Sequence, residues 1–480
     1  MKTYYIDSST QAGTGSYKDP LILSQATSTF YQALDPGDEI VFKPGLFVGQ
    51  LSLNGLRGTA DYPITVRWLD SATLDGDYRY PLGKAANETK LDIKRATYSH
   101  GLKNELPFVW SGLLQLKNCS FVNLISPTIL NSRGRSINLE LCDNITITEA
   151  QAVGCRNAFM VVTQTENINV QNSVFRDGGN FFPYSRSVSL VNWPVGINQI
   201  NSKNFIFDGN SVSEHWGEGI TSGKGCYGMY FSKNRIYNNA KMGVYLHMGF
   251  NSVWTDNLIY HTQNTPYVRG TKAPVAVVLN QEGKNFPNNH AGNITFKNNL
   301  IHWVDNTALA FWNNQGSDHV TKNVNILGNT FISNVAPFHN IGNGSVFEDL
   351  LVENNVFVNY DQHSAITVNT GSKLTSSQVT FRENSWSHTP TDPKLNTSDS
   401  LIGIPAFEGD ILKPLTSNAS VNPADYNIVD GSNGFRTADA EEVEEVEEVE
   451  EENKEALELS KVIQALEQIK GILEELLEAI

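Results

Sequence analysis

One pattern recurs through the middle of the chain and restricts its fold more than any other feature of the sequence. Each copy has two apolar residues separated by one position and an asparagine three positions later, as in Phe205, Phe207 and Asn210. Successive asparagines are 24, 23, 42, 30, 26 and 29 residues apart, at Asn210, Asn234, Asn257, Asn299, Asn329, Asn355 and Asn384. Alternating apolar residues indicate β-strands, and a repeat of about 20 to 30 residues with no helical pattern between copies indicates a β-solenoid. The longest interval indicates one coil with an insertion.

The pattern continues upstream with other residues in place of the asparagine. Cys119, Ala150 and Ser173 stand there, each after alternating apolar residues such as Ile145 and Ile147. About ten coils are therefore expected. An asparagine tolerates the left-handed backbone of a corner between strands, and its amide can hydrogen-bond the asparagines above and below. We expect a structural ladder rather than ligand-binding asparagines.

The start of the chain carries a second set of signals. Residues 4–7 are Tyr-Tyr-Ile-Asp, an amphipathic stretch follows at 28–34, and two further segments lie at 35–45 and 58–66. Together with the repeats, they resemble the right-handed parallel β-helix superfamily typified by pectate lyases, polysaccharide-degrading enzymes and phage tailspikes. The resemblance covers roughly residues 3–390. It implies an all-β fold, a single-stranded right-handed parallel β-helix of about ten coils with an N-terminal helix cap.

The repeats and the composition divide the chain into four regions. We expect a cap and first coil at 1–50, the parallel β-helix at 51–390, an irregular C-terminal cap or linker at 391–437, and an acidic spacer with an oligomerising helix at 438–480. The third region is rich in turn-forming residues, and the fourth begins with glutamates interrupted by a valine at every third position. An engineered junction is an alternative explanation for the abrupt change.

Charge and composition exclude several classes of function. The formal net charge is −16, but residues 439–480 contribute −13, with 16 acids and 3 bases, which leaves −3 for the rest. A body that is nearly neutral does not predict a nucleic-acid surface. No apolar run is long enough to insert into a membrane, and the start lacks the apolar core of a signal peptide. We expect synthesis in the cytoplasm without a signal peptide, followed by association with a virion or export by another route. The cysteines form no paired motif, so we expect four reduced core residues, at Cys119, Cys142, Cys155 and Cys226.

Four further strands are expected to stack into one sheet, at 243–247, 276–280, 308–312 and 365–369. Alternation places their apolar residues inside and directs a stripe of aromatic and amide side chains outward, namely Tyr245, His247, Asn280, Trp312 and Asn369. Flat apolar rings and fixed amide groups are what sugar binding requires, so the sequence predicts a polysaccharide groove along this stripe. The alternative is that the connection at 264–272 and the loop at 281–292 fold over these residues.

Groups able to transfer protons precede this stripe by one coil. His215, Glu218 and Lys224 lie in a segment with several glycines, and together with Tyr245 and His247 they are the catalytic candidates. The alternative is a corner motif in which glycines serve tight turns. Arg186 and Arg269 are candidates for binding a carboxylate with two hydrogen bonds, or are ordinary solvated arginines.

β-Elimination on an acidic glycan is favoured over hydrolysis, because the stripe offers few carboxylates. In the alginate-lyase and chondroitinase branch, a catalytic lysine and an arginine lie beside a calcium held by asparagine and glutamate. That pattern cannot be placed in order on this chain, and neither can the paired aspartates of galacturonases. The metal ligands are therefore not assigned, and calcium is the cofactor that the resemblance suggests. A non-catalytic virion or surface protein, used for glycan attachment or as a rigid spacer, is the alternative to a depolymerase.

The last helix is expected to assemble the chain. Its apolar residues are separated alternately by three and four positions, at Leu459, Val462, Leu466, Ile469, Leu473, Leu476 and Ile480. Such a heptad seam predicts a coiled coil, and further apolar residues beside it favour a trimer over a dimer. Docking into another assembly through residues 459–480 is the alternative. A β-helix followed by a trimerising helix is also the arrangement of phage tailspikes.

Truncation after Phe435 tests this expectation. Loss of the seam should convert an oligomer to a monomer, because a helix of this length is marginally stable without a partner. Light scattering measures the molar mass of both forms. An unchanged mass would rule out a coiled coil as the means of assembly.

Overall fold

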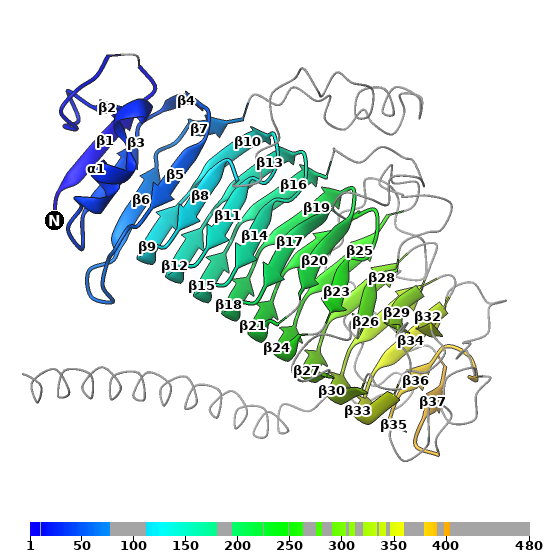
Figure 1. Cartoon of the computed structure of the whole chain (residues 1–480). Helices are drawn as coiled ribbons and strands as arrows, with labels where there is room; N and C mark the ends of the chain where they lie inside the picture. Colours follow the sequence, from blue (N-terminus) through cyan, green and yellow to red (C-terminus); the bar gives the residue numbers. More distant parts are fainter. Residues whose placement is uncertain are drawn as a thin grey trace, which may run out of the picture. The chain divides into compact units, whose positions relative to one another are not determined.

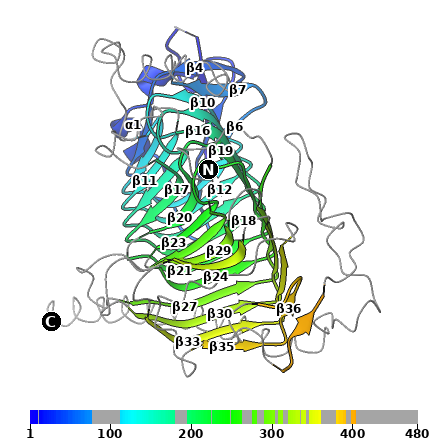
Figure 2. The ribbon, with the colours of Figure 1, turned by 90° about the vertical axis from the view of Figure 1, so that its right-hand side faces the viewer.

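The computed structural model describes residues 1–9, 11–76, 112–179, 194–223, 225–247, 249–262, 275–280, 290–303, 307–312, 320–333, 336–341, 346–359, 379–390 and 398–403. Within these ranges, nearly all regular structure is parallel β-sheet. The chain passes repeatedly through three long sheets, A, B and C, so that each coil adds one strand to each (Figure 1). Seen from the side, the strands of each sheet are stacked in sequence order (Figure 2). This is the expected parallel β-helix.

The strands of the three sheets have the following bounds. Sheet A contains β1 (Thr3–Asp7), β2 (Leu21–Ile22), β3 (Glu39–Phe42), β6 (Ile64–Trp68), β9 (Ser120–Ile125), β12 (Asp143–Thr148), β15 (Glu166–Gln171), β18 (Lys203–Asp208), β21 (Tyr227–Ser232), β24 (Phe250–Thr255), β27 (His290–Lys297), β30 (Val320–Leu327), β33 (Val346–Glu353) and β35 (Val379–Arg382). Sheet B contains β4 (Gly45–Val48), β7 (Ala72–Asp75), β10 (Thr128–Ser132), β13 (Gln151–Cys155), β16 (Val174–Gly178), β19 (Ser211–His215), β22 (Arg235–Tyr237), β25 (Leu258–His261), β28 (Leu300–Trp303), β31 (Thr330–Ser333), β34 (Val356–Asn359), β36 (Ser385–Trp386) and β37 (Leu401–Ile402). Sheet C contains β5 (Leu51–Asn54), β8 (Leu114–Lys117), β11 (Ile137–Glu140), β14 (Met160–Thr163), β17 (Val195–Ile200), β20 (Glu218–Ser222), β23 (Val244–His247), β26 (Val277–Asn280), β29 (Thr307–Trp312) and β32 (Ala336–Ile341).

The core runs along the inside of the three sheets. Alternate residues of each strand point inward, and parallel pairing places each one over its counterpart in the next coil. Aromatic rings stack in this way: the centroids of Phe231 and Trp254 are 3.8 Å apart, and those of Phe357 and Trp386 are 4.3 Å apart. The inward positions expected for the strands of sheet C are confirmed wherever their side chains are described, with exposed fractions of 0–3% at Val244, Leu246, Val277, Leu279 and Leu309.

The asparagine ladder is present at the corner between sheets A and B. Each ladder asparagine donates from Nδ2 to Oδ1 of the next, as between Asn257 and Asn299 at 2.8 Å and between Asn299 and Asn329 at 3.0 Å. The same Oδ1 atoms accept from backbone N–H groups one coil earlier, as Asn299 Oδ1 does from Asn257 N at 2.9 Å. The column continues to Asn384 and, in the other direction, to Ser173 and Ala150. The predicted structural role is confirmed.

Two details of the ladder differ from the expectation. The left-handed residue is not the ladder asparagine but the residue before it, such as Lys233 at a φ of 53° and Asp256 at 56°. The corner therefore uses one residue to turn the chain and the next to supply the amide. Cys119 was placed in this column wrongly. It lies at the corner between sheets C and A, where Glu166 N and Asp143 N bond to the carbonyls of Cys142 and Cys119.

The four cysteines are buried and free, as expected. They contribute small apolar side chains to the corners and the core, as shown by the Cys119 thiol, which donates to the Leu53 carbonyl at 3.0 Å. Burial raises the pKa of the Cys155 thiol to about 12 and that of Cys226 to about 11. Both thiols therefore stay protonated near neutral pH.

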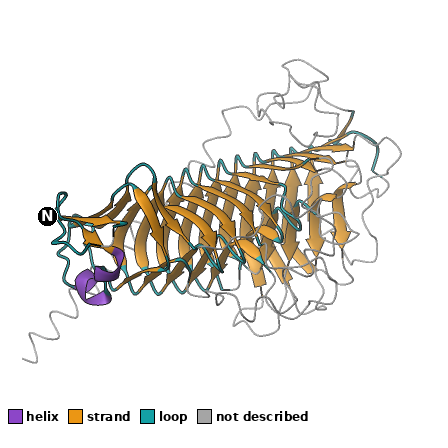
Figure 3. Cartoon of the chain, turned by 90° about the horizontal axis from the view of Figure 1, so that it is seen from above, coloured by secondary structure: helices purple, strands orange, loops and turns teal. Residues whose placement is uncertain are grey.

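The start of the chain forms a 3₁₀ turn, η1 (Leu23–Gln25), and a short helix, α1 (Ser28–Gln32). Figure 3 shows this helix at the N-terminal end of the coils. Thr27 Oγ1 accepts from Phe30 N at the start of α1, and Tyr31 is buried in the core. The helix lies within the expected amphipathic stretch. The expected heptad seam lies outside the described residues.

Removing one ladder amide should destabilise the protein. In Asn299→Ala, Asn257 N and Nδ2 lose their acceptor, and the Trp254 carbonyl loses a donor at 2.8 Å. Leaving these buried groups unpaired should lower the free energy of unfolding by about 2–4 kcal/mol. The matched control is Asn325→Ala, on the outward face of β30, with an expected change within about 0.5 kcal/mol. Denaturant unfolding followed by circular dichroism measures both, and equal losses would contradict the role of the ladder.

The free energy of unfolding should also decrease as the pH is lowered, because of His302. This residue lies on β28 and is fully buried. Burial lowers the pKa of its imidazole to about 3, whereas the unfolded chain has a pKa near 6.5. The unfolded state therefore binds the proton first, so stability present above pH ~6.5 is lost as the pH falls toward ~3. In His302→Phe, the slope of unfolding free energy against pH should decrease there by up to about 1.4 kcal/mol per unit. Unfolding midpoints across a pH series measure the slope, and an unchanged slope would show that His302 is protonated in the folded protein.

Candidate functional site

The outward face of sheet C carries the predicted stripe. In the register of its strands, His247 pairs with Asn280 and Asn280 with Trp312, so the three form one column along the axis. Tyr245 lies in a neighbouring column, between Thr221 and Val278. For Asn280 and Trp312 only the backbone is described, and Asn369 lies outside the described residues.

Tyr245 is on this face, but it is not open to solvent as expected. Its exposed fraction is 7%, and it packs with Val278 and Ala310, its column neighbours, and with the partly buried Met242. Its ring stacks on the half-buried imidazole of His247, with centroids 5.1 Å apart and planes within 10°. The prediction of a fully exposed stripe is wrong here, because this outward position packs among apolar side chains of its own face.

Glu218 is the first residue of β20, and its side chain lies on the same face. Its carboxylate accepts a hydrogen bond from Thr221 Oγ1 at 2.6 Å, and both residues are buried. Thr221 is the register partner of Tyr245 in the next coil. A carboxylate, a hydroxyl, a phenol and an imidazole therefore occupy adjacent positions on two coils.

His215 does not belong to this group. It ends β19 in sheet B and is fully buried, with Nε2 donating to the Asn157 carbonyl at 2.7 Å and Nδ1 accepting from Gly217 N at 3.1 Å. This pair of bonds assigns a neutral ring protonated on Nε2. A Cβ on Gly179 would lie 3.0 Å from Nε2, so a glycine is needed there. These contacts are those expected of the corner motif, and they leave both ring nitrogens of His215 bonded within the protein.

Three other candidates cannot be placed. Lys224, Arg186 and Arg269 all lie outside the described residues.

Three arginines at the entry to sheet C were not among the site residues predicted from the sequence. Arg133 and Arg156 directly follow β10 and β13, and the last residues of these strands, Ser132 and Cys155, are register partners. The two arginines therefore occupy equivalent positions on adjacent coils. Arg135 lies two residues before β11. The available signal was the separation of Arg133 from Arg156, 23 residues, which equals one coil length.

These arginines are partly or fully buried, with Arg156 only 5% exposed. Arg135 Nη1 donates to Asn138 Oδ1 at 2.7 Å. Burial lowers the pKa of the Arg135 guanidinium, and the nearby Glu140 opposes that shift. We call Arg133, Arg135 and Arg156 the arginine cluster. A guanidinium keeps its charge in proteins, so each arginine of the cluster stays cationic.

A row of polar side chains links the arginine cluster to Tyr245. One outward column of sheet C passes in register through Asn138, Val161, Asn198, Thr221 and Tyr245. Adjacent strands are about 4.8 Å apart, so the row extends for roughly 19 Å. Figure 1 shows its strands β11, β14, β17, β20 and β23 side by side. We call this row, with the arginine cluster, Glu218 and His247, the sheet C face.

The chemistry of the sheet C face is that of anion and polyol binding. Guanidinium groups bind carboxylates with two hydrogen bonds, and amide and hydroxyl side chains bind sugar hydroxyls. Glu218, Tyr245 and His247 add groups that can exchange protons. Within the described ranges, no three His, Cys, Asp or Glu side chains lie close enough to hold a metal ion, so no described cluster supports the calcium expectation. No described helix is long and apolar enough to cross a membrane.

Comparison with known proteins gives the following matches. No curated protein sequence matches the chain. The structure of this chain is similar to that of the alginate lyase from Paenibacillus sp. str. FPU-7. The two share 15% identity with a TM-score of 0.42, and the match covers 72% of this chain and 97% of that chain. The structure also matches PfbA, a surface adhesin of Streptococcus pneumoniae, with 10% identity, a TM-score of 0.47, and coverage of 70% and 79%. A mannuronic acid specific polysaccharide family 6 lyase from human gut microbiota matches with 13% identity, a TM-score of 0.47, and coverage of 83% and 90%.

At these TM-scores, none of the three carries an inference about what this chain binds or does. The family comparison concerns the fold. Residues 111–289 match the family model described as "Right handed beta helix region". The coils on both sides of that segment continue the same three parallel sheets. The expected architecture is confirmed: the described coils form a parallel β-helix, and residues 111–289 match the right-handed family model.

Proposed function

We propose that the chain binds an acidic polysaccharide along the sheet C face. The observation that carries this proposal is the arginine cluster, which lies at one end of the amide and hydroxyl row in a body with a net charge of −3 outside the tail. The fixed positive charge selects carboxylates. Within the row, Asn138, Thr221 and Tyr245 are 3%, 5% and 7% exposed, so the half-buried Asn198 is the amide with the best access to a sugar hydroxyl.

The finer proposal is that the chain cleaves this polymer by β-elimination. A base removes the C5 proton of a uronate, the electron pair forms the C4=C5 bond, and the oxygen at C4 leaves with a proton from an acid. The carboxylate of the reacting sugar needs a cation beside it to stabilise the charge that develops at C5. Arg186 and Arg269 are the candidates for this role, because the arginine cluster lies at the far end of the row from Tyr245. His247 and Tyr245 are the candidates for the base, and Glu218 for the acid. Trp312 and Asn280, in the His247 column, are candidates for binding the adjacent sugars.

A non-catalytic role is the second candidate, and one observation favours it. Glu218 and Tyr245 have exposed fractions of only 4% and 7%, which limits their access to a polymer. In this alternative, the sheet C face attaches a virion or surface protein to a glycan, or the coils act as a rigid spacer. A trimer formed through residues 459–480 would suit a phage tailspike in either case.

Binding and turnover measured together test the proposal. Arg135→Gln should weaken binding of a uronate polymer by about tenfold or more, because a charged hydrogen-bonding group is lost. Arg135→Lys should recover only part of the affinity, because lysine keeps the charge but not the planar fork. Isothermal titration measures binding, and the absorbance of the unsaturated product measures elimination. His247→Ala should abolish turnover with less effect on binding, and Trp312→Ala should do the reverse.

The matched control is Arg67→Gln on sheet A, where Arg67 pairs with Glu39 at 2.9 Å, and it should bind as the unmodified protein does. Thermal melting checks that each variant is folded. Binding without product would favour the attachment role. Equal affinities for Arg135→Gln and the control would refute the proposed binding face.

A further inference from the structure

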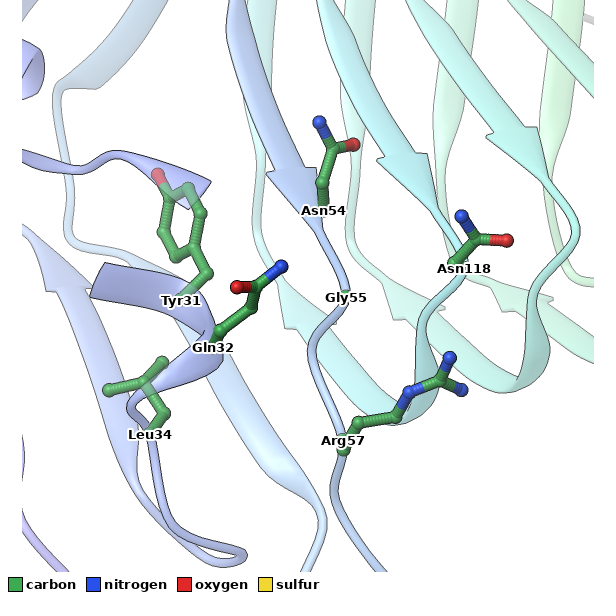
Figure 4. Close-up of a pocket in the computed structure, with 7 residues that line it drawn as sticks. All are labelled: Tyr31, Gln32, Leu34, Asn54, Gly55, Arg57 and Asn118. Carbon is green, nitrogen blue, oxygen red and sulfur yellow. The ribbon is translucent and has the colours of Figure 1, made fainter. Parts of the chain in front are cut away.

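A pocket of about 470 Å³ lies at the first coils, apart from the sheet C face (Figure 4). The end of α1, the end of β5 and the corner after β8 form its wall. The lining residues are Tyr31, Gln32, Leu34, Asn54, Gly55, Arg57 and Asn118. A volume of this size suits a small-molecule ligand.

The wall is rich in carboxamides and has one positive charge. Gln32, Asn54 and Asn118 each contribute an amide, and no lining residue is acidic. Figure 4 shows the Gln32 side chain extending toward Gly55, and the Arg57 side chain extending toward Asn118. The amides provide both donors and acceptors, whereas the guanidinium only donates.

Arg57 has an incomplete set of partners. Its described hydrogen bond goes from Nη1 to Ser120 Oγ at 3.4 Å, and no described carboxylate pairs with it. Two other cations on the outward surface of the coils do have such a partner. Lys117 pairs with Glu140 at 2.6 Å, and Lys203 with Glu166 at 2.8 Å. The guanidinium of Arg57 is therefore available to an external anion.

Asn54 supplies the complementary observation. Its Oδ1 atom is buried and accepts no hydrogen bond from any described group. A buried acceptor without a donor is costly, so turning the Asn54 carboxamide into the pocket, where a ligand hydroxyl can donate to it, would be favourable. The pocket thus combines a donor suited to a carboxylate with an acceptor suited to a hydroxyl.

Backbone conformation and packing shape the wall of this pocket. Gly55 has a φ of +75°, which glycine adopts without strain, and it lies beside the Gln32 side chain. Tyr31 is 1% exposed in the core and fixes α1 against the first coils. Burial raises the pKa of its phenol, so the hydroxyl stays protonated. The pocket is therefore built by α1 and the first two coils.

We propose that this pocket binds a small hydroxy acid of the sugar-acid class, with the carboxylate on Arg57 and hydroxyls on Asn54 and the neighbouring amides. The proposal depends on the chemistry of the pocket and not on the proposed function of the sheet C face. The pocket is a second site, on the corner between sheets C and A, where a monosaccharide or a chain end fits.

Ligand-observed NMR titration with glucuronate, glucose and inorganic phosphate tests the proposal on the full chain. Glucuronate should bind. Glucose and phosphate should each bind at least about tenfold more weakly, because glucose lacks the carboxylate and phosphate lacks the sugar hydroxyls. Arg57→Gln should weaken glucuronate binding by about tenfold or more. Arg57 is exposed, so this variant should fold normally.

Two controls separate the pocket from the sheet C face. Arg67→Gln should leave glucuronate binding unchanged. Arg135→Gln should weaken polymer binding while the pocket still binds glucuronate. Equal affinity for glucose would show that the carboxylate is not recognised. Equal affinity for phosphate would show a general anion site. Either result, or an unaffected Arg57→Gln variant, would overturn the proposal.

Discussion

The register of the coils depends on the buried amide ladder at the corner between sheets A and B. Each ladder asparagine satisfies a backbone N–H one coil earlier, a side-chain amide and a carbonyl, so a shift by one residue would leave several buried groups unpaired. Burying so many polar groups is tolerable because every one of them has a partner within the column. The ladder thus determines which residue lies over which in the coils that it spans, from Ser173 to Asn384.

This fixed register also determines the outer surface. Because side chains alternate along each strand, the register that stacks the inward aromatic rings also aligns the outward side chains. The arginine cluster arises in the same way, since Arg133 and Arg156 are equivalent positions on neighbouring coils. A long linear ligand is matched by a long linear column. The pocket at the first coil differs, because the helix α1 forms one of its walls.

Much of the fold could be predicted from the sequence, because both the period-two alternation and the repeated asparagine are local signals. The inward positions of β23, β26 and β29 and the column through His247, Asn280 and Trp312 follow from that alternation alone. The exposure of Tyr245 did not follow, because burial of an outward residue depends on what packs beside it. The burial of His215 could not be predicted either, because the sequence gives no direction for a side chain at a corner. The arginine cluster was missed because its members are adjacent only after the coils have been aligned.

The corner between sheets A and B and the connection from sheet B to sheet C differ in one respect that matters for binding. The corner between sheets A and B is short, as with Gly209 and Asn210. The connection from sheet B to sheet C varies in length, from the two residues between His215 and Glu218 to the long segment between Asp75 and Leu114. One edge of each coil is thus constrained by the ladder, while the opposite edge accepts insertions of very different length without disturbing the stack. Those insertions begin and end beside the outward face of sheet C. Ligand preference on this scaffold can therefore be altered by exchanging connections, with the supporting coils left intact.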